Sequence, residues 1–416
     1  MMNRREWLHS SISLAALGGQ SLLWAPSIAA DTNRLTHDAY FSALNDMLKL
    51  NGPGRPVMLL DQQRMRHNID LITAAVGPDK TYRVVVKSLP SLSLLDAVMK
   101  RAKTRALMVF HQPFANAIAD AFPDSDVLFG KPMPLSAARL FYARLTHTKF
   151  NPARQMQWLI DTPERLLQYQ TLARQLGLKM RINFELDVGL RRGGFDSHEG
   201  VAAALKLVLQ DPKHLEFAGF MGYEPQLTGL GADLKHPAVQ NVLSMYNSCI
   251  ATAKQAGVNV ELLTRNGAGS HTLPIYRGDQ TMNDLSAGSG VVKPTDFDTY
   301  HLAQNLPAIY IATPILKRYD RNPVMAAPPE NMQRLYYIYG GYWKAAMVSP
   351  AAVGQAPYQS TNQSPILTSS DVDLAVDDYM FLRPTQSESV MLQFGDLMVV
   401  DQGQLTDTWP VFQQTG

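Results

Sequence analysis

Between residues 55 and 305, short apolar segments typical of buried β-strands alternate with longer segments of helical periodicity. The strand-like segments are Pro56–Leu60, Tyr82–Val86, Ala106–Phe110, Asp126–Phe129, Trp158–Ile160, Lys179–Asp187, Phe217–Met221 and Val260–Thr264. The helical segments include Gln62–Ala75, Pro163–Leu176, His198–Gln210 and Pro237–Ala256. Repeated strand–helix units need a parallel sheet, and this number of them predicts an α/β fold with a (β/α)8 TIM-like barrel. The alternation alone also fits a doubly wound sheet.

The pattern changes after about residue 300, where strands follow one another without intervening helices. These strands are Ala308–Ala312, Arg334–Tyr339 and Asp396–Val400, with glycine and proline scattered between them. Such a pattern predicts an all-β domain. We therefore divide the mature chain into an N-terminal segment (31–54), a barrel (55–305) and a C-terminal β domain (306–416).

The first 30 residues have the pattern of an export signal. Arg4 and Arg5 precede an aromatic residue and a leucine, and an apolar run over 12–24 leads to small residues over 25–30. This pattern resembles a twin-arginine signal peptide, with a general secretory signal as the alternative. We expect a periplasmic protein with no stable membrane insertion after cleavage. Because the twin-arginine route carries folded proteins, often with a cofactor installed, the signal also favours a bound cofactor.

The composition limits the partners that the protein is expected to bind and the cross-links that can stabilise it. The formal net charge is +2 and the chain has no basic run, so we expect no nucleic-acid partner. Its one cysteine, Cys249, rules out an intrachain disulfide and lies in a helical context, where it is expected to be a buried small hydrophobe.

Lys87 directly follows the apolar run Val84–Val86. Strands of a parallel barrel place their terminal side chains at the mouth where active sites lie. A desolvated lysine there has a lowered pKa and can act as an amine nucleophile, above all as a Schiff-base former. The alternative is a strand-end lysine that reaches into solvent.

Two glycine-rich turns follow in the second half of the barrel, Asn266–Ser270 and Ala287–Gly290. Glycine lets the backbone approach an anion, and successive N–H groups with a serine hydroxyl can bind a phosphate. An ordinary turn is the competing interpretation.

Charged residues follow another strand of the predicted barrel. Glu185 and Asp187 stand two residues apart at a strand end and are expected to point to one face, with Arg191 and Arg192 just after them. The carboxylates fit a glycosidase pair, a metal site or a charge network with the arginines. Arg192 can also pair with the phenolate oxygen of a pyridoxal ring. Tyr223, after a strand and a glycine, is expected at the same mouth or in a structural role.

An ordered series of motifs resembles the family of D-threonine aldolase and eukaryotic-type D-serine dehydratase. These are fold-type III pyridoxal-phosphate enzymes related to the alanine racemase barrel, and the resemblance spans about residues 55–412. The motifs are Arg83-x-x-x-Lys87, Asp187–Gly194, Gly222-Tyr223-Glu224, Asn266–Ser270, Gly288-Ser289, Leu382–Glu388 and Asp407–Val411.

The resemblance implies a pyridoxal 5'-phosphate cofactor, a small amino acid substrate and a homodimer. It implies that Lys87 is the Schiff-base lysine, that Arg192 contacts the cofactor and that Tyr223 belongs to the active site. The implied phosphate-binding residues are Asn266, Gly267, Gly269 and Ser270.

The chain departs from this family at the metal site. The family's Pro-x-His-x-Cys/Asp segment reads Pro384–Glu388 here, which leaves Gln386 and Glu388 as doubtful metal ligands suited to a hard ion such as Mg²⁺ or Ca²⁺. Val85 and Gln226 stand where relatives keep histidines. We therefore expect no tightly bound zinc, and metal-assisted chemistry at a β-hydroxyl group that is altered or absent.

Three hypotheses follow for the function. The first is a lyase that cleaves or dehydrates a β-hydroxy D-amino acid, with Lys87, Tyr223 and Glu388 as catalytic residues; a racemase using Lys87 and Tyr223 is its close alternative. The second is a non-catalytic protein that binds pyridoxal phosphate or an amino acid. The third is a cofactor-free barrel hydrolase that uses Glu185 and Asp187.

Overall fold

The computed structural model describes residues 36–145, 149–321, 331–351, 353–354 and 358–413. The predicted signal peptide lies outside these residues. Within them, a closed parallel barrel of eight strands is followed by a nine-stranded sheet, which confirms the predicted fold class.

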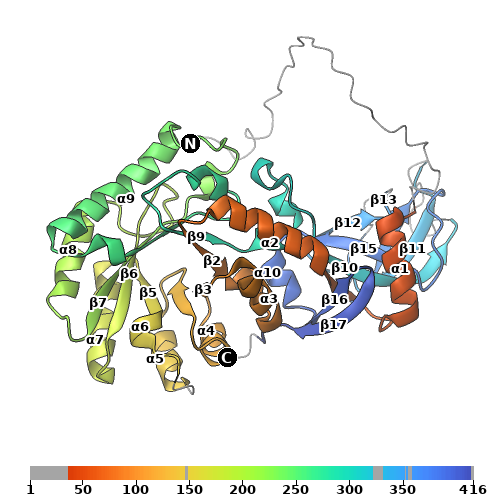
Figure 1. Ribbon diagram of the computed structural model, residues 1–416. Helices are drawn as coiled ribbons and strands as arrows, with labels where there is room; N and C mark the ends of the chain where they lie inside the picture. The colour runs from red at the N-terminus through yellow and green to blue at the C-terminus, as the bar shows by residue number, and fades with distance from the viewer. Residues whose placement is uncertain (1–35, 146–148, 322–330, 352, 355–357, 414–416) are drawn as a thin grey trace, which may run out of the picture.

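The barrel lies at one end of the elongated molecule and the sheet at the other (Figure 1). Its strands are β2 (Thr81–Val85), β3 (Ala106–Val109), β4 (Asp126–Phe129), β5 (Met156–Ile160), β6 (Met180–Glu185), β7 (Leu215–Met221), β8 (Thr264–Gly267) and β9 (Asp284–Ala287). The surrounding helices are α2 (Gln62–Val76), α3 (Leu92–Ala102), α4 (Gln112–Ala121), α5 (Leu135–Ala143), α6 (Pro152–Gln155), α7 (Pro163–Leu176), α8 (His198–Leu209) and α9 (Pro237–Gln255).

Local signals in the sequence set several of these helix boundaries. Asp61 accepts a hydrogen bond from the backbone N–H of Arg64 and so caps the start of α2. Thr162 caps α7 in the same way ahead of Pro163, and Gly177 ends that helix in the left-handed conformation. The strands between the helices are buried because helices cover the outside of the barrel and side chains fill the inside.

Two of the predicted barrel strands differ from the structure. The segment predicted over Pro56–Leu60 forms β1 (Val57–Asp61), which pairs with β10 (Ile309–Tyr319) and β16 (Asp396–Asp401) in the C-terminal sheet. The prediction over Val260–Thr264 was also wrong: Val260–Leu262 is a 3-10 turn, and the strand β8 begins at Thr264.

The strand that closes the barrel instead is β9, which the sequence did not reveal. Asp284 and Ser286 of β9 point into the barrel, where both accept hydrogen bonds from Asn266. Polar residues at alternate positions gave this four-residue strand the appearance of a loop.

An ion-pair network ties the barrel together from inside. Arg83 of β2 is 1% exposed, and its guanidinium contacts both oxygens of the Asp284 carboxylate at 2.7 and 2.9 Å. The same guanidinium contacts Asp126 of β4 at 3.1 Å. The network therefore links the first, third and last strands of the barrel.

The second sheet has the strand order β13-β14-β11-β10-β1-β16-β17, with β15 paired to β10 and β12 paired to β15. Its other strands are β11 (Arg334–Tyr339), β12 (Ala345–Ser349), β13 (Val353–Gly354), β14 (Gln363–Thr368), β15 (Tyr379–Pro384) and β17 (Gln404–Pro410). Helix α1 (Ala39–Asn51) packs Phe41, Leu44 and Leu48 against one face of this sheet.

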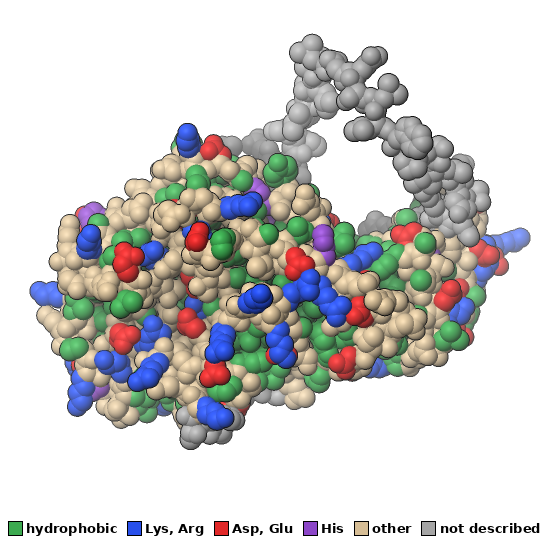
Figure 2. Space-filling model, in the orientation of Figure 1, with side chains coloured by type: hydrophobic (Ala, Val, Ile, Leu, Met, Phe, Trp, Pro, Cys, Tyr) green, Lys and Arg blue, Asp and Glu red, His purple; other side chains and the backbone are tan. Residues whose placement is uncertain are grey.

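A short helix after β15 brings the C-terminal part of the chain to the barrel. This helix, α10 (Ser387–Met391), lies beside the turn η3 (Val86–Ser88) that follows β2, between barrel and sheet (Figure 1). The face in Figure 2 carries interspersed positive and negative side chains rather than a field of one sign. In the described part of the chain, no helix is long and apolar enough to cross a membrane.

Candidate active site

A pocket opens at the carboxyl ends of the barrel strands, where α10 meets the barrel. Its volume is about 330 Å³, within the range typical of small-molecule sites. Residues that follow β2, β7, β8 and β9 line it, together with residues of α10. It thus collects side chains from both parts of the fold.

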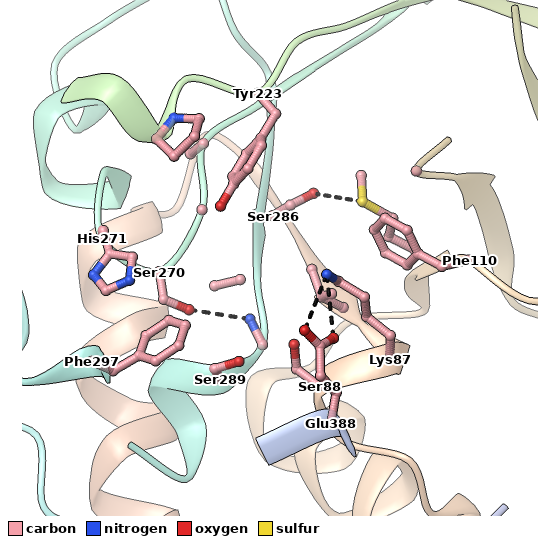
Figure 3. Close-up of a pocket in the computed structure, with 18 of the residues that line it drawn as sticks. Lys87, Ser88, Phe110, Tyr223, Ser270, His271, Ser286, Ser289, Phe297 and Glu388 are labelled. Carbon is pink, nitrogen blue, oxygen red and sulfur yellow. Dashed lines mark hydrogen bonds and ion pairs between the residues drawn. The ribbon is translucent and has the colours of Figure 1, made fainter. Parts of the chain in front are cut away.

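Lys87 lies in this pocket, but in the turn η3 rather than at the end of β2. Its Nζ is 3.2 Å from Oε2 and 3.4 Å from Oε1 of Glu388 in α10 (Figure 3). The Lys87 side chain is 44% exposed and its Nζ lies 4.9 Å from the ring centroid of Phe110. The expected desolvated amine is therefore a half-exposed amine paired with a carboxylate.

The two glycine turns meet at Ser270. The Ser270 hydroxyl accepts hydrogen bonds from the backbone N–H groups of Gly288 at 3.3 Å and Gly290 at 3.0 Å. Gly269, Ser270 and Gly288 all line the pocket. The predicted pair of turns thus forms one continuous wall, and Figure 3 shows it across the pocket from Lys87.

Two residues of the predicted phosphate loop lie beneath this wall and are not among the lining residues. The side chain of Asn266 points into the barrel and donates to Asp284 at 2.5 Å and to Ser286 at 2.8 Å. Gly267 packs so closely on Met282 that an added Cβ would overlap the Met282 sulfur.

Tyr223 follows β7 and projects its hydroxyl into the pocket from the side opposite Lys87 (Figure 3). The Arg192 guanidinium lies 5.1 Å from the Tyr223 ring centroid. Burial, then Glu224 and Glu388, raise the pKa of the Tyr223 hydroxyl, while Arg192 lowers it. The net direction is upward, so Tyr223 is a neutral hydroxyl near neutral pH.

The Glu185–Asp187 pair does not line the pocket. Glu185 is buried beside Arg192, with 3.3 Å between Oε1 and Nη2, and burial raises the pKa of its carboxyl against the opposing effect of Arg192. The Asp187 carboxylate holds the loop that follows it, because it accepts hydrogen bonds from the backbone N–H groups of Gly189 and Arg191. Of the interpretations considered from sequence, this geometry matches the charge network for Glu185.

Both doubtful metal ligands line the pocket but already have partners. The Gln386 amide donates to Asp296 at 2.5 Å, and Glu388 is paired with Lys87. Among the described residues, no group of three or more His, Cys, Asp and Glu side chains is placed to hold a metal ion.

Several lining residues were not identified from sequence. His271 stacks on Phe297 with ring centroids 4.3 Å apart, and burial lowers the pKa of the His271 imidazole. Ser289, which lies in the predicted second glycine turn, contacts Ser387 at 3.2 Å and joins that turn to α10. The position of His271, next to Ser270, was the one signal available; Phe297 reaches the pocket only through tertiary packing.

A protein-family model, "Alanine racemase, N-terminal domain", matches residues 60–293, more than half of the chain. A comparison with curated protein sequences finds no significant match.

Solved structures of several enzymes share the whole two-part fold. D-Threonine aldolase from Filomicrobium marinum is 15% identical with a TM-score of 0.68, covering 86% of this chain and 96% of that one. D-threo-3-Hydroxyaspartate dehydratase from Delftia sp. HT23 is 13% identical with a TM-score of 0.67, covering 91% and 99%. Alanine racemase from Clostridium difficile 630 is 14% identical with a TM-score of 0.67, covering 86% and 99%. These enzymes share the barrel and the β domain with this chain, and the family model matches more than half of it. The chain therefore belongs to the alanine racemase N-terminal domain family of fold-type III pyridoxal-phosphate enzymes.

Proposed function

We propose that this protein is a pyridoxal-phosphate-dependent lyase that acts on a β-hydroxy D-amino acid, with Lys87 as the residue that binds the cofactor covalently. The observation that carries this proposal is the position of Lys87. Its amine faces a pocket whose opposite wall is built from glycine backbone and the Ser270 hydroxyl.

The glycine wall fits an anionic group such as a phosphate. An added Cβ at Gly288 would lie 2.8 Å from Cβ of Ser88, and one at Gly269 would lie 2.9 Å from the Tyr223 ring. Only glycine lets the backbone lie this close to its neighbours. Gly269, Ser270 and Gly288 are the residues we expect to hold the phosphate, and Arg192 and Tyr223 the ring.

When bound, the cofactor withdraws electrons from the Cα of an attached amino acid and so weakens the bonds to that carbon. The chain's own residues then handle protons. Glu388, at 3.2 Å, can accept a proton from the Lys87 amine or from a hydroxyl group held in the same place. Tyr223, whose raised pKa keeps it neutral, can donate a proton from the opposite side.

The substrate class comes from the structural neighbours. Two of them are named for D-amino acids with a hydroxyl group on the β-carbon, D-threonine and D-threo-3-hydroxyaspartate. The carboxylate of Glu388 beside Lys87 gives this chain a base for such a hydroxyl group that needs no metal. This supports aldol cleavage or dehydration.

Racemisation is the second candidate, and the placement of Tyr223 opposite Lys87 favours it. A racemase needs a proton acceptor on each face in turn. The raised pKa keeps Tyr223 protonated, so that near neutral pH the phenolate needed to accept a proton is scarce, which favours the lyase.

Incubation of the cofactor-loaded protein with D- and L-β-hydroxy amino acids in deuterated water tests the assignment. A lyase that catalyses aldol cleavage splits the D-isomer into an aldehyde and glycine, whereas one that catalyses dehydration converts it into a keto acid. A racemase returns the opposite isomer with deuterium at Cα. Equal rates with and without a chelator would show that no metal is needed, and absence of every product would favour the non-catalytic alternative.

We further propose that the protein is exported to the periplasm by the twin-arginine route and works as a homodimer. Replacement of Arg4 and Arg5 by lysine should leave the protein in the cytoplasm on cell fractionation. Light scattering of the purified protein should give twice the mass of the mature chain, whereas a monomer mass would overturn this part of the proposal.

A further inference from the structure

Glu224 follows the pocket tyrosine directly, yet its carboxyl group faces away from the pocket and is completely buried. It lies behind the loop Ala268–Thr272, which carries Gly269 and Ser270 into the pocket wall. A buried carboxyl group is costly unless its oxygens are hydrogen-bonded, so its contacts indicate what it does.

The contacts of Glu224 reach both ends of this loop. Its Oε1 accepts a hydrogen bond from the Thr272 hydroxyl at 2.8 Å, and that hydroxyl oxygen accepts one from the backbone N–H of Gly269 at 3.0 Å. The backbone of Ala268 also lowers the pKa of the Glu224 carboxyl group. Through the Thr272 hydroxyl, Glu224 is therefore connected to the end of the loop and to Gly269 near its start.

The loop needs such support because its conformation is strained. Ala268 has a φ of +68°, in the left-handed region that a residue with a Cβ adopts at a cost. Gly269 packs so closely on Tyr223 that an added Cβ would lie 2.9 Å from the ring. A small shift of the loop would thus move both the Ser270 hydroxyl and the tyrosine.

The charge of Glu224 can change near neutral pH. Burial raises the pKa of its carboxyl group to about 7, against the effect of the Thr272 and Ala268 hydrogen bonds. The titratable groups that face it from neighbouring elements are Tyr246 of α9 and Tyr276 of the turn η6 (Leu273–Tyr276), and burial raises the pKa of both hydroxyls. They stay neutral, so the carboxyl group alone changes charge there.

An unpartnered pair of buried atoms lies at the same place. In the described structure, neither Oε2 of Glu224 nor the hydroxyl of Tyr276 has a hydrogen-bond partner, although the two groups influence each other's pKa. A protonated Glu224 can donate from Oε2 to the Tyr276 oxygen. An ionised Glu224 instead places a negative charge directly behind the loop.

We propose that Glu224 is a positioning residue that fixes the Ala268–Thr272 loop, and that its protonated form gives the pocket its higher affinity for the phosphate of the cofactor. The second part rests on the proposed function. An ionised carboxylate behind the loop repels a phosphate in front of it, and burial keeps this repulsion from being screened.

Glu224→Gln is the informative variant because its amide oxygen can still accept from the Thr272 hydroxyl and the side chain carries no charge. Pyridoxal phosphate is titrated into the unloaded wild type and variant, with intrinsic tryptophan fluorescence as the readout, at about pH 6 and about pH 8.5. The protonation state of the ligand affects the Kd values of both proteins equally, so its effect cancels when their ratio is taken. We expect equal affinity at the lower pH and about tenfold weaker binding by the wild type at the higher pH. An unchanged ratio across this range would overturn the charge effect.

Hydrogen exchange of the peptide around 266–276, without any ligand, tests the positioning role separately. Glu224→Ala should expose the Ala268 and Gly269 amides and speed their exchange about tenfold or more, whereas Glu224→Gln should protect them as the wild type does. Equal protection in all three proteins would overturn the positioning role. If no protein binds pyridoxal phosphate, the proposed function fails while the exchange result still stands.

Discussion

Replacing Arg83 by methionine tests the ion-pair network inside the barrel. Arg83 is 1% exposed and Asp284 is 4% exposed, and the two are joined by contacts of 2.7 and 2.9 Å. Methionine fills much of the same volume but leaves the carboxylate of Asp284 buried without its charge partner. Removing one partner of a buried ion pair costs about 3–5 kcal/mol.

Two further contacts place the expected loss in the upper part of that range. Arg83 also donates to the backbone carbonyls of Leu107 and Asp126, each at 3.1 Å, so the variant leaves two more acceptors with fewer partners. A loss of about 4–5 kcal/mol is a large share of the roughly 5–15 kcal/mol that stabilises a typical domain. We therefore expect the urea midpoint to fall steeply and the barrel to become only marginally stable.

Urea unfolding followed by circular dichroism measures this loss, with Arg101→Met as the matched control. Arg101 makes a similar two-point contact with Asp70, at 2.5 and 2.7 Å, but both side chains are more than 40% exposed. An exposed pair contributes about 0–1 kcal/mol. If Arg83→Met costs no more than Arg101→Met, the network is not what holds the barrel strands together.

Three further predictions concern the site and its surroundings. Glu388→Gln should lower kcat about 10²- to 10⁴-fold through loss of the base beside Lys87, and leave the Kd for pyridoxal phosphate nearly unchanged; equal loss of both would contradict the assigned role. Gly288→Ala should weaken cofactor binding by about 1–3 kcal/mol, because the new Cβ would lie 2.8 Å from Ser88, whereas Gly231→Ala, which meets no neighbour, should bind normally. Because burial raises the pKa of Glu224 to about 7, the unfolded chain loses this proton first, and wild-type stability should fall by about 3 kcal/mol between about pH 4.5 and pH 7. The Glu224→Gln variant should lack this fall in a pH series of unfolding curves, and parallel curves for the two proteins would contradict the assigned burial effect.

Hydrophobic pattern and helix signals were enough to predict the architecture, because buried strands and capped helices follow local rules. The errors came from strands whose partners the sequence does not show. β1 reads as a barrel strand but pairs across the molecule with β10 and β16. β9 is polar at alternate positions because Asp284 and Ser286 face Arg83 and Asn266 inside the barrel.

The site was predicted where residues follow a strand directly and missed where tertiary packing brings them in. Lys87, Tyr223 and Ser270 line the pocket as expected from their positions after strands. Asn266 lies in the same motif as Ser270, yet the strand turns its side chain into the barrel. The direction of a side chain at the end of a strand depends on register, which spacing alone does not give.

The most direct test of the central claim is the identity of the residue that binds pyridoxal phosphate. The loaded protein is reduced with borohydride, digested and analysed by mass spectrometry. Lys87→Ala is treated in the same way, and so is Lys131→Ala as a control, because Lys131 is exposed and lies next to the pocket residue Gly130. We expect the cofactor mass on the peptide that contains Lys87 in the wild type and in Lys131→Ala, and on no peptide of Lys87→Ala. A label on another lysine, or no label on the wild type, would contradict the account.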